Sequence, residues 1–265
     1  MRFCSLGSGS KGNGTLVQKG DTCLLIDNGF TLKEVESRLA QKGLTPLDLT
    51  AILVTHEHGD HIKGVGPLAR KYRIPVYLSY GTAQHEGLGK LSSYRIIDAH
   101  SSFDIGALTV TPVVVPHDAR EPTQYVVSDG QFRVGVLTDL GSLTPHILEV
   151  YQQCHGLLLE TNHDVGMLQQ GPYPPKLKVR VGGPLGHLSN EQAVQFLHSV
   201  ETQQLQYVVA THISEQNNHA PLAVSMLAQV LGWTEEQIIL ADQQLGFDWC
   251  ELVEQSVQKQ ATAAL

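Results

Sequence analysis

The 265-residue chain has few cysteines, few aromatic residues and little charge of either sign. It contains four cysteines, 6% aromatic residues and 17% charged residues. None of the cysteines forms a C-x-x-C pair, which favours buried thiols in a reducing compartment over disulfides. No apolar run approaches the roughly 18 residues of a membrane helix, and the first residues lack the apolar stretch of a signal peptide. We therefore expect a cytoplasmic protein with no membrane partner.

The remaining composition is that of a globular enzyme-sized domain. Hydrophobic residues make up 42% of the chain, which excludes a disordered protein. The net charge of −8 argues against non-specific coating of nucleic acid but leaves room for a local basic groove. No repeat, charge block or linker divides the chain. We predict a single domain over residues 1–265, and no pattern specifies its oligomeric state.

Strand-like and helix-like segments are mixed along the chain, which favours an α/β layered fold. Thr31 with Glu34 and Ser189 with Gln192 form capping boxes that predict two helix starts. Residues 166–186 are rich in glycine and proline and predict a long surface loop. Expected strands cover residues 2–6, 15–18, 22–27, 50–55, 75–79, 156–160, 206–211 and 238–241 and dominate residues 94–138; expected helices follow residue 31 and cover residues 61–72, 144–152, 191–201, 221–231 and 235–237.

The glycine-rich segment 7–12 matches the G-x-G-x-x-G pattern of dinucleotide-binding proteins. That fingerprint must open a helix, whereas residues 13–18 read as a turn into a second strand. We therefore interpret the segment as a hairpin loop. It is either a simple turn or a loop whose backbone N–H groups approach a substrate such as a phosphate.

The strongest signal is the sequence Thr-His-Glu-His-Gly-Asp-His at residues 55–61. Three imidazoles and two carboxylates follow an apolar strand within one tight turn. Imidazole suits zinc and other borderline metals, and a carboxylate adds charge and hardness. Three unrelated histidines would rarely gather there by chance, so the segment indicates a metal site.

The H-x-H-x-D-H pattern after an apolar strand resembles the metallo-β-lactamase fold of binuclear hydrolases. Further candidate ligands follow in the family's order, each at a predicted strand end: His117, Asp139 and His212. Asp27 ends an earlier predicted strand, like the family's early aspartate. The resemblance covers nearly the whole chain. It implies a four-layer αββα sandwich, in which two mixed β-sheets are flanked by helices.

The resemblance also implies a ligand set for two divalent metal ions per chain. It assigns His56, His58 and His117 to the first ion, Asp60, His61 and His212 to the second, and Asp139 as a bridge between both. Asp27 would orient the motif by hydrogen bonds, and Glu57 would not be a ligand. Zinc, manganese and iron are all compatible with such ligands.

His187 is a further candidate, because it lies just before the helix that Ser189 caps. The N-terminus of that helix favours an anion. In phosphodiesterase branches of the fold, ribonuclease Z among them, a histidine in a similar segment protonates the leaving oxygen, which suggests that role for His187. The alternative is an exposed histidine ahead of a helix. The candidate catalytic residues are thus Asp60 and His187.

The finer resemblance is to the YycJ (WalJ) branch, whose members are described as 5′-to-3′ DNA exonucleases. It rests on residues 5–13, 161–164, 186–190 and 211–214. It implies a DNA substrate and attack by hydroxide formed on two metal ions. Candidate substrate contacts are Ser8 in the glycine-rich segment and Lys178 and Arg180 in the basic stretch before His187. No role follows for residues 162–164.

Other functions remain open on the sequence. A cyclic phosphodiesterase, a glyoxalase-like thioesterase or a lactonase would use the same seven ligands. The basic stretch and His187 count against the last two. A metal-binding regulatory protein without turnover would typically have lost ligands, and here the set is complete. A flavodiiron protein fits less well, because its site prefers a carboxylate within the motif and no flavin domain follows.

Overall fold

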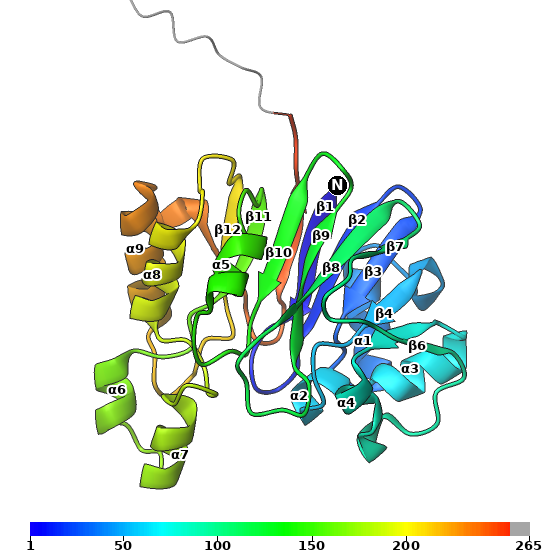
Figure 1. The fold of residues 1–265 in the computed structure, drawn as a ribbon, viewed down its shortest axis with the longest axis horizontal. Helices are drawn as coiled ribbons and strands as arrows, with labels where there is room; N and C mark the ends of the chain where they lie inside the picture. Colours follow the sequence, from blue (N-terminus) through cyan, green and yellow to red (C-terminus); the bar gives the residue numbers. More distant parts are fainter. Residues whose placement is uncertain (255–265) are drawn as a thin grey trace, which may run out of the picture.

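The computed structural model describes residues 1–254 and contains two seven-stranded β-sheets that pack face to face between helices (Figure 1). Along sheet A the strands are β14 (Phe247–Glu251), β1 (Arg2–Gly7), β2 (Gly14–Lys19), β3 (Thr22–Ile26), β4 (Ala51–Leu53), β5 (Val76–Leu78) and β6 (Tyr94–Ile96). Along sheet B they are β13 (Ile238–Leu240), β12 (Tyr207–Thr211), β11 (Gly156–Glu160), β10 (Arg133–Leu137), β9 (Thr123–Ser128), β8 (Leu108–Val114) and β7 (Phe103–Ile105). The predicted αββα sandwich is confirmed.

Short helices connect and cover the sheets. The α-helices are α1 (Leu32–Gln41), α2 (Gly59–Ile62), α3 (Val65–Tyr72), α4 (Tyr80–Ala83), α5 (Pro145–Val150), α6 (Val165–Gln170), α7 (Pro175–Val181), α8 (Asn190–Ser199) and α9 (Ala220–Leu231). Three 3₁₀ turns are η1 (Pro46–Asp48), η2 (Glu86–Leu88) and η3 (Glu235–Gln237). Both predicted capping boxes are present, at the starts of α1 and α8. None of the helices among residues 1–254 has the length and apolar character needed to span a bilayer.

Each sheet is antiparallel in one part and parallel in the other. In sheet A, β3, β4, β5 and β6 are parallel neighbours, whereas in sheet B the parallel strands are β10, β11, β12 and β13. The carboxyl ends of parallel strands lie at one edge of a sheet, where binding residues gather. Segments that leave β3, β4, β10, β11 and β12 therefore meet along one edge of the sandwich.

Two hydrophobic cores hold the layers together. One lies between the sheets and extends beneath α1 and α3, with Phe3, Tyr125 and Val209 among its buried members. The other lies between sheet B and α5, α8 and α9, and contains Tyr151 and Phe196. All four cysteines are buried and unpaired, as the sequence predicted. The metal motif is thus mounted on a rigid, closely packed scaffold.

The predicted loop over residues 166–186 is wrong in part, because it contains most of α6 and all of α7. The Asp164 side chain accepts a hydrogen bond from the Met167 N–H and caps α6. Pro175 occupies the first turn of α7, where its missing N–H costs no hydrogen bond. The proline-rich run therefore starts a helix, and the basic stretch that contains Lys178 and Arg180 is helical.

Two smaller expectations also change. The single helix predicted over residues 61–72 is divided between α2 and α3 at Gly64, where a Cβ atom would lie 1.9 Å from the Phe30 carbonyl oxygen. Strand β14 was not predicted, and it pairs with β1 at the edge of sheet A. The glycine-rich segment does form the loop of an antiparallel hairpin between β1 and β2, as predicted.

Candidate metal centre

The predicted ligands converge at the carboxyl edge of the two sheets. Four overlapping groups of potential ligand atoms lie within 4.8 Å of one another: His56, His58 and His117; Asp60, His61 and His212; His56, His61 and Asp139; and Asp139, Glu160, His187 and His212. The motif leaves β4 of sheet A, whereas His117, Asp139 and His212 leave β8, β10 and β12 of sheet B. The site therefore lies where the edges of the two sheets meet.

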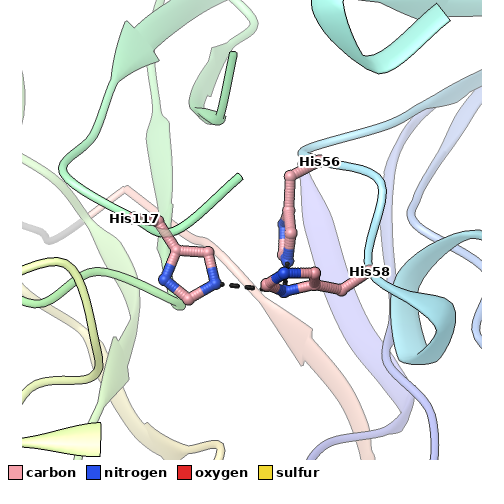
Figure 2. A group of neighbouring side chains, drawn as sticks. All are labelled: His56, His58 and His117. Carbon is pink, nitrogen blue, oxygen red and sulfur yellow. Dashed lines mark hydrogen bonds between the residues drawn. The ribbon is translucent and has the colours of Figure 1, made fainter. Parts of the chain in front are cut away.

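Three imidazoles form the first subsite (Figure 2). His56 Nε2 lies 3.0 Å from His58 Nδ1, and His117 Nε2 lies 3.2 Å from the same His58 atom. The other nitrogens of two of these rings are already engaged. His56 Nδ1 contacts the Thr55 hydroxyl at 2.9 Å, and His117 Nδ1 donates to the Gly186 carbonyl at 3.0 Å.

This arrangement matches the requirements of a cation. With Nδ1 of His56 and His117 engaged, the lone pairs of both Nε2 atoms point toward His58 Nδ1. Nitrogen lone pairs repel one another unless a proton or a metal ion lies between them, and three neutral imidazoles are common zinc ligands. His56 and His117 are also buried, and burial lowers the pKa of both rings, which keeps them neutral and able to bind a metal.

The second subsite is formed by Asp60, His61 and His212. Asp60 Oδ2 lies 3.6 Å from His61 Nε2 and 3.7 Å from His212 Nε2. His61 donates from Nδ1 to Asp27 Oδ2 at 2.8 Å, and the Thr55 N–H and hydroxyl donate to the same carboxylate. Asp27 therefore orients His61 with Nε2 facing the subsite, which is the role that the resemblance implied for it.

Asp139 lies between the two subsites. Its Oδ2 atom is 3.1 Å from His61 Nε2, and its Oδ1 atom is 3.5 Å from His212 Nε2. Among residues 1–254, Asp139 Oδ2 and His212 Nε2 are buried atoms with no hydrogen bond of good geometry. Buried polar atoms are rarely left without a partner, so both fit as ligands to an ion. Burial raises the pKa of Asp139, but the surrounding imidazoles outweigh it and hold that pKa well below its usual range.

The backbone is strained at three of these positions. Asp27, Asp139 and His212 have φ values of 62°, 54° and 52°, the left-handed region that favours glycine. Each residue comes directly after a strand or one residue beyond it, so the chain turns sharply at the sheet edge. Such conformations cost about 1–3 kcal/mol each and cluster at functional sites. These conformations therefore lower the free energy of unfolding, and they direct the three side chains toward the site.

Glu160 is a site residue that the sequence interpretation missed. It ends β11, is fully buried, and accepts hydrogen bonds from the backbone N–H groups of Leu140 and Leu188. Its Oε1 atom lies 2.8 Å from His187 Nδ1. A usable signal existed, because Glu160 follows an apolar strand just as Asp139 and His212 do.

The ion pair between Glu160 and His187 sets the charge of both groups. Burial alone lowers the pKa of His187, but the Glu160 carboxylate outweighs it and raises that pKa above its ordinary value. Burial alone raises the pKa of Glu160, but the His187 ring dominates and lowers it to about 2. The Glu160 carboxylate thus favours the protonated form of His187, and the His187 ring stacks on that of His212 with 5.2 Å between the ring centroids.

The carboxylate of Asp118 lies next to the first subsite. Asp118 Oδ1 is buried and lies 3.5 Å from His117 Nε2 and 3.9 Å from His58 Nε2. Its Oδ2 atom pairs with Arg180 at 2.5 Å. Arg180 thus connects α7 to the edge of the site. The sequence suggested Arg180 as a substrate contact and gave no indication of its carboxylate partner.

The other expected residues have these positions. Ser8 is buried, and its hydroxyl accepts a hydrogen bond from the His212 N–H. Lys178 of α7 is half-buried and donates to the Gln169 carbonyl of α6. Asn162 donates to the His212 carbonyl, whereas His163 is buried behind the site. Asn13, which the sequence did not single out, places its amide nitrogen 3.0 Å from His61 Nε2.

The αββα sandwich, the histidine- and aspartate-rich edge and the Glu160–His187 pair beside it are the features of a metal-dependent hydrolase. The family model of the beta-lactamase superfamily domain matches residues 22–213. The chain belongs to this superfamily of metallo-β-lactamase fold proteins.

Similar proteins agree with that assignment. The exodeoxyribonuclease YycJ of Bacillus anthracis is 35% identical over 235 residues, which cover 87% of this chain and 89% of that protein. The exodeoxyribonuclease WalJ of Streptococcus pneumoniae is 35% identical over 239 residues, which cover 86% and 89%. The crystal structure of the metallo-β-lactamase fold protein YhfI from Bacillus subtilis aligns with a TM-score of 0.71 at 19% identity, covering 94% of this chain and 99% of that one.

Proposed function

We propose that this protein is a binuclear metal-dependent phosphodiesterase that degrades DNA from an end, most simply as a 5′-to-3′ exonuclease. The observation that carries the proposal is the Glu160–His187 pair beside Asp139, because it supplies a proton donor for a poor leaving group. The names of the relatives YycJ and WalJ support DNA as the substrate.

The ligand groups described above suit two divalent ions, with Asp139 within reach of both. When bound, such ions would supply an activated water and positive charge at the phosphate. Zinc and manganese are the metals that the ligands favour, and iron is compatible with them.

The residues of this chain would perform the remaining steps. Glu160 holds the His187 ring by its Nδ1–H, which leaves Nε2–H as the proton donor. His187 would give this proton to the departing alkoxide oxygen of the sugar. Arg180 and Lys178 on α7 would contact phosphates of the strand, which requires Arg180 to leave Asp118. Ser8 would support the site through the His212 backbone.

A general acid matters most where the leaving group is a poor one. A thiolate leaves readily without protonation, so a thioesterase would gain little from His187. A lactonase has no phosphate for the basic stretch on α7 to bind. A cyclic phosphodiesterase would use the same residues and is therefore the competing function.

One assay separates these functions. The purified protein is analysed for metal per chain and supplied with manganese or zinc, then given end-labelled single- and double-stranded DNA, a cyclic phosphodiester and a thioester. We expect two metals per chain and stepwise release of nucleotides from one DNA end, and we expect His56→Ala to abolish that release. Turnover of only the small substrates would contradict the nuclease proposal. No turnover with fewer than two metals would favour a regulatory metal-binding protein.

A further inference from the structure

A cleft of about 150 Å³ opens beside the metal centre. His187 and His212 line one part of it, so it begins at the groups that would act on the scissile phosphate. Its walls come from several separate segments, among them those that carry Ser10 in the glycine-rich loop, Tyr173 ahead of α7, and Ser214 after β12. The cleft is therefore continuous with the proposed site of reaction.

Tyr173 is the only tyrosine, tryptophan or phenylalanine that lines this cleft within residues 1–254. It is half-buried and stands between Pro172 and Pro174, which restrict the backbone around it. The Gly171 N–H donates to the Met167 carbonyl and closes α6 immediately before it. A rigidly held aromatic ring in a polar cleft is the usual platform for stacking a nucleobase.

The size of the cleft limits what can enter. Its volume equals that of about five molecules of liquid water, which is the scale of one planar base and too small for several stacked bases. One planar base at Tyr173 would fill it, so the sugar and phosphodiester attached to that base would lie at the end of the cleft that His187 and His212 line.

An ion pair joins two walls of the cleft. Lys11 Nζ lies 2.6 Å from Glu215 Oε1, and this pair connects the glycine-rich loop to the segment after β12. Ser10 and Glu215 both line the cleft, so the bridge lies against its boundary. Both side chains are 60% exposed, so this ion pair marks the rim of the cleft and a bound ligand could displace it at little cost.

We propose that this cleft binds the terminal nucleotide of a DNA strand, with its base stacked on Tyr173 and its internal phosphodiester at His187 and His212. This inference rests on the proposed nuclease function and extends it. An enzyme that binds DNA in this way would require a free end. Its choice of substrate would depend on the identity of the terminal nucleotide rather than on the internal sequence.

The test compares Tyr173→Ala, Tyr173→Phe and, as a matched control, Tyr94→Ala, which removes an exposed tyrosine on the edge strand β6. The substrates are single-stranded oligonucleotides with either a normal or an abasic residue at the end that the wild type degrades first, and a circular single strand. KM and kcat are measured for release of the first nucleotide. Binding of the same linear oligonucleotides is measured by fluorescence anisotropy in the His187→Ala background, which suppresses cleavage.

We expect Tyr173→Ala to raise KM and weaken binding by about tenfold for the normal end, with Tyr173→Phe and Tyr94→Ala close to the wild type. The abasic end should be as poor in the wild type as the normal end is in Tyr173→Ala, and the circle should resist cleavage. An abasic end handled like a normal one would overturn the cleft proposal. Cleavage of the circle at the rate of linear DNA would contradict the proposed exonuclease function as well.

The two proposals fail in different ways. A protein that cleaves no DNA contradicts the proposed nuclease function, but the anisotropy measurement still tests the cleft. Equal binding of normal and abasic ends would then reject the cleft proposal as well. A nuclease that is indifferent to Tyr173 rejects the cleft proposal alone.

Discussion

The metal centre has two halves that the chain builds in different ways. The motif half consists of residues 55–61, a continuous turn that carries four potential ligands after β4. The strand-end half consists of His117, Asp139, Glu160 and His212, single residues that sheet B brings together from across about one hundred positions of sequence. The motif half is fixed by local geometry, whereas the strand-end half exists only once the sheet has formed.

The two halves also differ in what fixes the side chains. In the motif half, Asp27 and Thr55 hold the rings through side-chain hydrogen bonds. In the strand-end half, Asp139 and His212 are directed by left-handed backbone conformations, and Glu160 is held by backbone N–H groups. Removing side chains from each half therefore tests what each half contributes to the site.

The largest effect should come from Asp139→Ala, because Asp139 contacts groups of both halves. We expect loss of at least one metal ion and a fall in phosphodiesterase activity of at least about a hundredfold. Metal analysis and initial rates measure this, with Asp21→Ala, an exposed aspartate, as the control. Two bound metals with full activity in Asp139→Ala would refute the bridging assignment.

Removing one ligand from each subsite should separate the two ions. His58→Ala should leave the ion at Asp60, His61 and His212, and His212→Ala should leave the ion at His56, His58 and His117. Each variant should therefore bind one metal per chain in place of two, and both should lose most activity, because two ions act together. The loss of both metals in either variant would show that the two subsites do not bind independently. His100→Ala, at an exposed position, is the control.

Loss of the proton donor should depend on the leaving group. His187→Ala should slow hydrolysis of a dinucleotide by about a hundredfold or more, and bis(p-nitrophenyl) phosphate much less, because p-nitrophenolate leaves without a proton. Glu160→Gln should show the same pattern with a smaller loss, since it removes the charge that holds His187 protonated. Both variants should keep their metals, as should the control His146→Ala. Equal loss on both substrates would contradict the general-acid role.

A smaller effect should follow from Asp118→Asn. Asp118 Oδ1 contacts the rings of the first subsite, so its neutral analogue should weaken metal binding there by about tenfold, the low end for residues that orient ligands. Arg180→Gln should weaken it less, because Arg180 acts through Asp118. Competition with a metal chelator measures both affinities. An unchanged affinity in Asp118→Asn would mean that Asp118 serves only to anchor α7.

The smallest effect concerns the segment that presents His187. Ser189 caps α8 in a capping box with Gln192. Ser189→Ala should lower the free energy of unfolding by about 1 kcal/mol, measured by urea denaturation. His187 lies two residues before the cap, so the Ser189→Ala variant should also hydrolyse dinucleotides somewhat more slowly than the wild type. Ser199→Ala, near the end of the same helix, is the control and should alter neither quantity as much.

The amino-acid sequence by itself identified residues 55–61 as a candidate metal motif, because all their chemistry lies within one turn. The resemblance to the metallo-β-lactamase fold that this motif carries predicted the fold class, and it pointed to Asp139 and His212 as candidate ligands at strand ends. Capping boxes at Thr31 and Ser189 fixed two helix starts, since capping depends on local contacts alone. The prediction of a loop over the proline-rich run before α7 was wrong, because the same residues are compatible with a loop and with the first turn of a helix.

Tertiary structure alone decided the partners that act across long separations. Glu160 acquires its role only when the segment between α7 and α8 brings His187 to the end of β11, and Asp118 only when α7 brings Arg180 to it. The cleft at Tyr173 requires several segments from distant parts of the chain. Such contacts depend on which segments lie side by side, and side-chain spacing along one strand or helix does not encode that arrangement.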